Sequence, residues 1–173
     1  MWTRMKVFFA ILLTVVLLAA GLWTYVVVRS NETASSDQQE ILDTLGNPDR
    51  FVLTYLPQGE GDDVRLVRSE TWVYDGHGWS VSFLAGDVFS TEETQVRTEL
   101  TYLDADPTDF SFSMGYDDVL VALGSPEVVE PVDQATDLFT TDEVETYATD
   151  HTFFTIEAGH LVYLETVGLR EEP

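Results

Sequence analysis

The strongest constraint on the fold is an internal similarity, because most landmarks of the segment 41–88 recur later in the chain. The sequence Ile-Leu-Asp-Thr-Leu-Gly-Asn-Pro-Asp at 41–49 is matched by Val-Leu-Val-Ala-Leu-Gly-Ser-Pro-Glu at 119–127. A second landmark, Val-Ser-Phe-Leu-Ala-Gly-Asp-Val at 81–88, is matched by Phe-Thr-Ile-Glu-Ala-Gly-His-Leu at 154–161. Self-similarity of this kind indicates a duplicated supersecondary unit.

Each copy is predicted to be one helix followed by an antiparallel sheet, over 38–103 and 113–173. The helices end at the Leu-Gly-x-Pro sequences, because glycine adopts the left-handed C-cap and proline cannot continue a helix. The alternation of apolar and polar residues that follows is typical of half-buried antiparallel strands. The linker at 104–112 is interpreted as a solvated, helix-capping connection. The predicted fold class is therefore α+β, with two tandem helix-plus-sheet repeats.

The charge of the chain narrows its possible partners. Among 173 residues, 31 are acidic and 8 are lysine or arginine, so that the formal net charge is −23. Nucleic acid is excluded as a partner, because phosphate binding requires a basic surface. The acidity is interpreted as an aid to solubility or an adaptation to concentrated salt. A role in binding cations or a basic partner is the alternative.

The sequence has no pattern typical of an enzyme. The absence of cysteine excludes disulfides, thiol nucleophiles and zinc-thiolate sites. His77, His151 and His160 lack the local pairing that metal ligands usually show. Neither a Gly-x-Ser-x-Gly elbow nor a glycine-rich phosphate loop occurs. The chain is therefore predicted to be no enzyme and to have no catalytic residues, no metal site and no cofactor.

The beginning of the chain predicts a membrane anchor. The run Val7–Val28 contains no charged residue, and a helix of that length spans the roughly 30 Å of a bilayer's hydrocarbon core. Basic residues favour the cytoplasmic side for 1–6. The prediction is a single-pass, signal-anchored protein of the cell membrane, with a polar tether at 29–37 and an extracytoplasmic body. A cleaved signal peptide is the alternative, and Asn31 fits the N-glycosylation pattern.

Several short motifs together resemble a known family. They are Leu45-Gly46-Asn47-Pro48, Trp72-Val73-Tyr74 and Phe83-Leu84-Ala85-Gly86-Asp87-Val88 in the first copy, with Leu123-Gly124-Ser125-Pro126 and Ile156-Glu157-Ala158-Gly159-His160-Leu161 in the second. This combination resembles the small outer-membrane lipoproteins of the bacterial β-barrel assembly machinery. In tandem it is similar to the β-lactamase-inhibitor-protein fold, in which two copies join their sheets into one concave surface.

The resemblance covers about residues 38–167 and implies a non-enzymatic binding module outside the cytoplasm. The chain departs from the family in two respects. It has no cysteine to carry a lipid or to form the inhibitor's disulfides, and Glu145 is aligned with Trp72 of the first copy. The resemblance therefore implies a fold and a mode of binding, and no specific activity.

A binding function directs attention to the sheet face that the helices leave uncovered. Alternation places Trp79, Val81 and Phe83 on the covered face. The opposite face is predicted to display Ser80, Ser82, Arg97, Glu99, Thr101, Phe153 and Thr155. An aromatic residue such as Phe153 on a wet face is typical of an interface anchor. We hypothesise a module for protein binding or envelope assembly that uses this face, and the alternative is a salt-adapted or cation-binding structural domain of the envelope.

Overall fold

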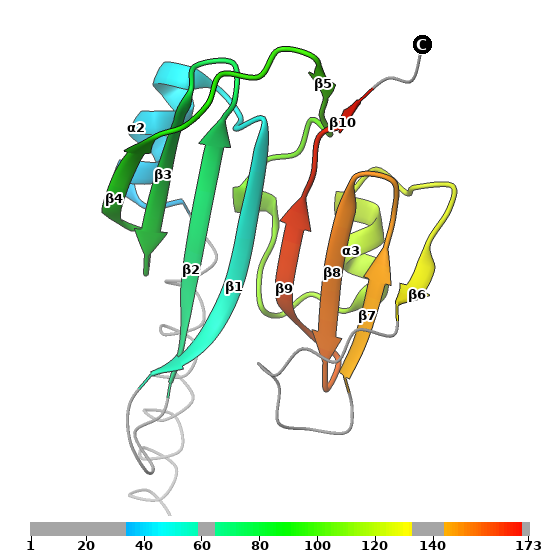
Figure 1. Ribbon diagram of the computed structural model, residues 1–173. Coiled ribbons are helices and arrows are strands. Elements are labelled where there is room, and N and C mark those ends of the chain that lie inside the picture. Colours follow the sequence, from blue (N-terminus) through cyan, green and yellow to red (C-terminus); the bar gives the residue numbers. More distant parts are fainter. Residues whose placement is uncertain (1–33, 59–64, 133–143, 171–173) are drawn as a thin grey trace, which may run out of the picture.

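The computed structural model describes residues 34–58, 65–132 and 144–170, and its main feature is an eight-stranded antiparallel sheet (Figure 1). The strand order is β4-β3-β2-β1-β9-β8-β7-β6. These strands are β1 (Arg50–Gln58), β2 (Arg65–Tyr74), β3 (Trp79–Leu84), β4 (Asp87–Glu93), β6 (Glu130–Val132), β7 (Val144–Ala148), β8 (Thr152–Glu157) and β9 (His160–Thr166). A separate two-stranded pair joins β5 (Leu100–Thr101) to β10 (Leu169–Arg170).

The helices of the described residues lie on one side of the sheet, which is the far side in Figure 1. They are α2 (Ser36–Leu45), α3 (Tyr116–Ala122) and the short 3-10 helix η2 (Pro107–Asp109). Helix α2 covers strands of the first half of the chain, and α3 covers strands of the second half (Figure 1). The other face of the sheet is free of helices, and we call it the open face.

The predicted fold class, an α+β body of two helix-plus-antiparallel-sheet repeats behind a transmembrane helix, is corrected by this architecture. The described body is mostly one antiparallel sheet with two short α-helices. The strands of the two halves belong to one sheet, because β1 pairs with β9. Local alternation predicts that strands exist, but it does not reveal a pairing between residues so distant in sequence.

The predicted membrane anchor is also corrected. Within the three described ranges, no helix combines the length and the apolar character that crossing a membrane demands. The prediction of a transmembrane, single-pass, signal-anchored protein of the cell membrane is therefore withdrawn. It rested mainly on the hydropathy of Val7–Val28, and that run lies outside the described residues, as do 1–6 and Asn31.

Helix α2 begins after Ser35, which is its N-cap. The Ser35 hydroxyl accepts a hydrogen bond from the Gln38 N–H at 3.1 Å. The Gln38 side chain accepts in return from the Ser35 N–H at 2.9 Å, which completes a capping box. The helix ends at Leu45, at the place that the Leu-Gly-x-Pro motif predicts, and Gly46 is its C-cap with a φ of 78° and a ψ of −166°.

The core lies between the helices and the covered face of the sheet. Val81 and Phe83 are buried there and Trp79 is half-buried against the same core, which confirms the inward face that alternation predicts for these residues. Trp72 of β2 is buried beside them. The rings of Trp72 and Phe83 lie 4.6 Å apart between centroids, within the range favoured by aromatic pairs. The second half contributes Phe154 and Leu164, both fully buried, to the same cluster.

Two hairpins turn in the same way at corresponding places. The connections between β3 and β4 and between β8 and β9 each have two central residues, Ala85-Gly86 and Ala158-Gly159, with positive φ angles. Positive φ at both positions defines the type I′ turn, whose twist matches that of the flanking strands. Each hairpin also contains a register shift close to its turn. The shift lies between Ser82 and Phe83 in the β3–β4 hairpin and between Thr155 and Ile156 in the β8–β9 hairpin.

The strand registers correct one correspondence between residues of the first and the second copy. Trp72 lies opposite Val81 on β3, and Tyr147 lies opposite Phe154 on β8. Tyr147, rather than Glu145, therefore occupies the place that corresponds to Trp72. The difference arises because the connection between β7 and β8 is shorter than the one between β2 and β3.

The linker is only partly solvated. Asp106 caps η2 as a linker carboxylate is expected to do, since its Oδ1 accepts a hydrogen bond from the Thr108 N–H at 2.8 Å. Ala105, Pro107 and Phe110 are nevertheless buried. The linker therefore packs against the sheet as part of the core.

Candidate functional site

The open face is the candidate site, and its residues follow from the pairing registers. A row runs across five strands through Ser82, Thr71, Val52, Glu165 and Phe153. Eight strands spaced by about 4.8 Å make this face roughly 34 Å wide. That width is comparable to the extent of a protein–protein contact surface.

A second row on the same face consists of Ser69, Thr54, Tyr163, Thr155 and Thr146. Neighbouring hydroxyls satisfy one another between the strands. The Thr146 and Thr155 hydroxyl oxygens lie 3.1 Å apart, and those of Thr71 and Ser82, in the first row, lie 3.0 Å apart. Paired hydroxyls of this kind fix the side-chain rotamers and leave a rigid, uncharged surface.

Four of the predicted site residues share this face. Ser80 and Ser82 lie on β3, and Phe153 and Thr155 lie on β8. Ser82 and Phe153 are half-buried, whereas Ser80 and Thr155 are buried. Small side chains inside a wide sheet are shielded by larger neighbours across the strands, as Thr155 is by Tyr163 on β9.

The other three predicted site residues do not lie on the main sheet. Strand β4 ends at Glu93, and Arg97 and Glu99 belong to the segment between β4 and β5. Thr101 lies in β5, where its hydroxyl donates to the Leu169 carbonyl at 3.2 Å. The placement of Arg97, Glu99 and Thr101 on one sheet face requires a strand through this segment, but β3 begins at Trp79 and provides no further residues to pair with. The segment turns toward the β2–β3 connection instead, where the Arg97 N–H donates to the Asp75 carbonyl at 3.0 Å.

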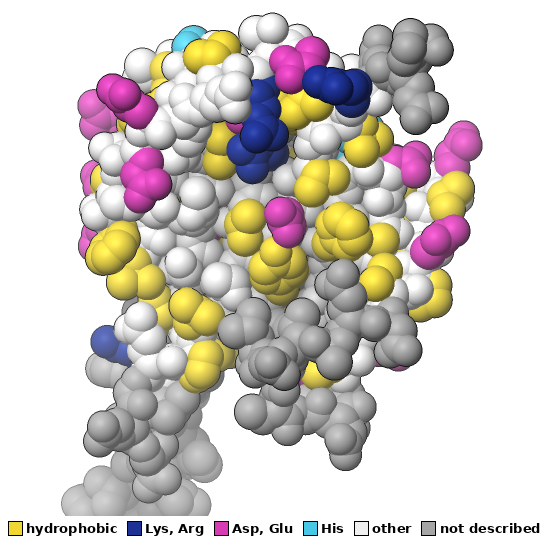
Figure 2. All heavy atoms as spheres, viewed as in Figure 1, with side chains coloured by type: hydrophobic (Ala, Val, Ile, Leu, Met, Phe, Trp, Pro, Cys, Tyr) yellow, Lys and Arg dark blue, Asp and Glu magenta, His cyan; other side chains and the backbone are white. Residues whose placement is uncertain are grey.

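Tyr163 and Glu165 form the centre of the open face, and sequence reasoning missed both. The Tyr163 hydroxyl donates to Glu165 Oε2 at 2.6 Å. Burial of the Tyr163 hydroxyl, together with this hydrogen bond and the charge of Glu165, raises the pKa of Tyr163. Figure 2 shows hydrophobic side chains gathered over the middle of the face around one acidic group. The alternation in β9 could have indicated these residues, but the register shift beside Ile156 hides which residues face outward.

A cluster of polar groups marks one end of the open face, where dark-blue side chains gather in the upper part of Figure 2. Arg50 donates from Nε to Asp75 Oδ2 at 2.7 Å, and Tyr102 donates its hydroxyl to the same oxygen at 3.0 Å. Burial of the Asp75 carboxyl would raise its pKa, but the hydrogen bond and the charge of Arg50 outweigh burial and lower it. Burial and the contact with Asp75 raise the pKa of Tyr102 to about 12.

Asp75→Asn is expected to lower the free energy of unfolding at pH 7 by about 1 to 3 kcal/mol, because the Asp75 side chain is only 1% exposed and accepts charged hydrogen bonds. The folded-state pKa is lowered, so this stabilisation is complete above the ordinary value of about 3.9 and is lost as the pH falls through the folded value. Urea titrations at pH 7 and below pH 3 measure the difference. Asp150→Asn, at an exposed site, is the control, and a loss that does not vary with pH would contradict the charge-based account.

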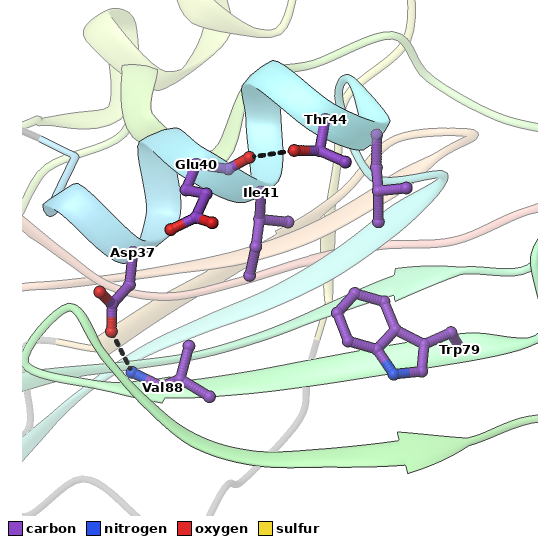
Figure 3. A pocket seen from close by; sticks show the side chains of 7 residues that line it. Asp37, Glu40, Ile41, Thr44, Trp79 and Val88 are labelled. Carbon is purple, nitrogen blue, oxygen red and sulfur yellow. Dashed lines mark hydrogen bonds between the residues drawn. The ribbon is translucent and has the colours of Figure 1, made fainter.

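A separate hollow lies on the helix-covered side, between α2 and the edge strand β4 (Figure 3). Its lining is formed by Asp37, Glu40, Ile41, Thr44, Leu45, Trp79 and Val88. The Asp37 carboxylate accepts a hydrogen bond from the Val88 N–H at 3.3 Å, which connects the first turn of α2 to the sheet edge.

None of the three histidines belongs to the two central rows of the open face. His151 lies before β8, with its Nδ1 3.4 Å from the Val167 carbonyl oxygen. His77 lies in the β2–β3 connection, with its ring 6.4 Å from that of Tyr74. His160 stacks on Phe112 at 4.6 Å between ring centroids. In the part of the chain that the structure describes, no three side chains among His, Asp and Glu gather in a way that could hold a metal ion.

Comparison with known proteins gives no match to any family model, to any curated protein or to any solved structure. The resemblance to the outer-membrane lipoproteins and to the β-lactamase-inhibitor-protein fold therefore stays a prediction.

Proposed function

We propose that this chain is a non-enzymatic protein-binding module whose contact surface is the open face. The observation that carries the proposal is the depletion of charge at the centre of that face. The chain contains 31 acidic residues, yet in the two central rows Glu165 is the one charged side chain. Depletion of charged residues, with aromatic residues at the centre, is the compositional signature of an interface core.

The backbone of the site supports the same proposal. The face is carried by hydrogen-bonded strands with a continuous core beneath them, so that binding orders few groups and costs little conformational entropy. Phe153 and Tyr163 are half-buried and offer rigid aromatic surface to a partner. The paired hydroxyls around them have their hydrogen bonds satisfied in the free protein, so that burying them incurs no large desolvation penalty.

Arg50 and Arg97 lie beside Asp75 at one end of the open face, where the rim of such a surface is expected. The Arg50 guanidinium is held by Asp75, while Arg97 is exposed and has a charge that acts on Asp75. Rim charges mainly affect the association rate and the choice of partner. A partner that presents an acidic group beside an apolar patch would complement this arrangement.

Phe153→Ala is expected to weaken capture of the partner by at least tenfold, because central aromatic residues contribute most of the free energy of binding at an interface. The measurement is crosslinking and affinity capture with the full chain in its own cells, comparing wild type with the variant. Val121→Ala, at an exposed site on α3, is the matched control. A partner that the wild type, Phe153→Ala and Val121→Ala capture equally would contradict the assignment to the open face.

A further inference from the structure

A groove runs along the edge strand β4 on the helix-covered side of the sheet. Besides the hollow of Figure 3, a second hollow is lined by Leu45, His77, Gly78, Trp79, Glu93, Thr94 and Val96. The two hollows share Leu45 and Trp79. The two hollows therefore adjoin each other, and we call them together the α2–β4 groove.

The floor of the α2–β4 groove is apolar and accessible. Val88 is 42% exposed and Val96 is 57% exposed, and they lie near opposite ends of β4. Ile41, Leu45 and Trp79 are half-buried, so that each presents part of its side chain to solvent. Exposed apolar surface of this kind, rimmed by polar groups, is typical of an interaction site.

The rim of the groove is acidic. Asp37 and Glu40 line its first part, and Glu93 lines its second part. No lysine or arginine occurs among the lining residues of either hollow. The groove therefore combines an apolar floor with one sign of charge, and it complements a segment that combines apolar with basic side chains.

A second copy of this chain does not fit the groove. Each copy carries a net charge of −23, so that two acidic rims would repel each other. Acidic residues on β4, namely Asp87, Glu92 and Glu93, also oppose strand pairing with another copy along this edge. The same residues attract a basic partner.

We propose that the α2–β4 groove binds a basic, amphipathic segment of a partner protein, at a surface distinct from the open face. The apolar side chains of the segment pack on Trp79, Leu45 and Val88, and its lysine or arginine side chains meet Asp37, Glu40 and Glu93 at the rim. Grooves of this type recognise short segments through a few apolar anchors at regular spacing. The open face and this groove lie on opposite sides of the sheet, so that the two surfaces bind independently.

The test uses the full chain and three labelled peptides of equal length: one of leucine and lysine with amphipathic spacing, one with glutamate in place of lysine, and one with serine in place of leucine. Fluorescence anisotropy at low and at physiological salt measures the binding. The leucine–lysine peptide is expected to bind, and the other two are expected to bind at least tenfold more weakly. The affinity for the leucine–lysine peptide is expected to fall as the salt concentration rises, because salt screens the attraction between charges at an exposed rim.

Two variants locate the binding. Val88→Glu is expected to weaken binding of the leucine–lysine peptide by at least tenfold, because it puts a charge on the apolar floor. Val121→Glu introduces the same residue at an exposed position of α3 and is expected to change the affinity less than twofold. Glu40→Gln with Glu93→Gln keeps the floor and is expected to reduce the salt dependence.

Equal weakening by Val88→Glu and Val121→Glu would overturn the proposal, because it would show general attraction to an acidic protein. Unchanged binding in Val88→Glu and in the Glu40→Gln, Glu93→Gln double variant would overturn it as well. Loss of binding in Phe153→Ala would place the peptide on the open face instead. These outcomes therefore distinguish a wrong assignment of the peptide site to the α2–β4 groove from a wrong assignment of protein binding to the open face.

Discussion

Replacement of Arg68 by Met is expected to lower the free energy of unfolding by about 3 to 5 kcal/mol, because it leaves a buried carboxylate without its counter-charge. Arg68 Nε lies 2.7 Å from Glu70 Oε1, and the side chains of both residues are almost fully buried. Urea titration at pH 7 measures the loss. Arg65→Met, at the exposed start of β2, is the matched control and is expected to cost less than about 0.5 kcal/mol.

The effect is large because Glu70 is the centre of a network. Its carboxylate also accepts hydrogen bonds from Gln38 Nε2 at 2.6 Å and from Trp72 Nε1 at 2.9 Å. Arg68 in turn donates to the carbonyl of Pro107 at 2.7 Å and to that of Phe110. The pair thereby connects α2, β2 and the linker, three segments that are distant in sequence.

A double variant separates charge from packing. Arg68→Met with Glu70→Leu removes both charges, and replacing a buried pair by apolar residues of similar volume is often nearly neutral. The double variant is therefore expected to be more stable than Arg68→Met alone. If the two variants were equally unstable, the loss would come from packing and from the linker carbonyls, and the ion pair would not be its source.

Leu164→Ala is expected to lower the free energy of unfolding by about 2 to 5 kcal/mol, through lost burial and the cavity that remains. Leu164 is 0% exposed and lies opposite Leu53 on β1 and Phe154 on β8. Thermal and urea unfolding measure the loss, and Val128→Ala, at an exposed site, is the control. A loss below about 1 kcal/mol would show that the contact between β1 and β9 contributes little to stability.

Because of the position of Leu164, this variant also tests the pairing of β1 with β9, which joins the two halves of the sheet; we call this pairing the joint. Strands β1 and β9 share only the pairs from Val52 to Thr54 with Glu165 to Tyr163. The joint also contains the Thr166 hydroxyl, which accepts a hydrogen bond from the Phe51 N–H at 2.8 Å. Because the ladder is short, the buried side chains beneath it carry most of its stability.

Features that depend on neighbouring residues could be predicted from the sequence. The C-cap at Gly46 and the turns at Gly86 and Gly159 follow from local backbone geometry, since glycine tolerates a positive φ. The inward face of β3 follows from a period of two along one strand. Ser80, Ser82, Phe153 and Thr155 share a face in the structure for the same reason.

Features that depend on distant pairing could not be predicted. Arg97, Glu99 and Thr101 continue an alternating pattern, but a strand exists only where a neighbouring strand offers hydrogen bonds. The buried pair of Arg68 and Glu70 also gives no signal, because charged residues in a strand normally indicate its wet face.

The absence of Tyr163 and Glu165 from the predicted site residues has a similar explanation. Tyr163 and Glu165 reach the centre of the open face because β9 pairs with β1, a contact between the two ends of the described body. The bulge in the β8–β9 hairpin changes which residues face outward, and a one-residue change of register exchanges the two faces of a strand. The N-terminal run, whose hydropathy suggested a membrane anchor, lies outside the described residues, and no helix among the described residues is long and apolar enough to cross a membrane.

The most direct test of the central claim is photocrosslinking from the open face. A photoreactive amino acid is placed at Ser82 in one protein and at Val121, on α3 at the far side of the sheet, in another. A crosslinked partner is expected from position 82; it is expected to be absent from position 121 and to be lost in the Phe153→Ala background. A partner crosslinked equally from both positions, or from position 121 alone, would contradict the claim that the open face is the binding surface.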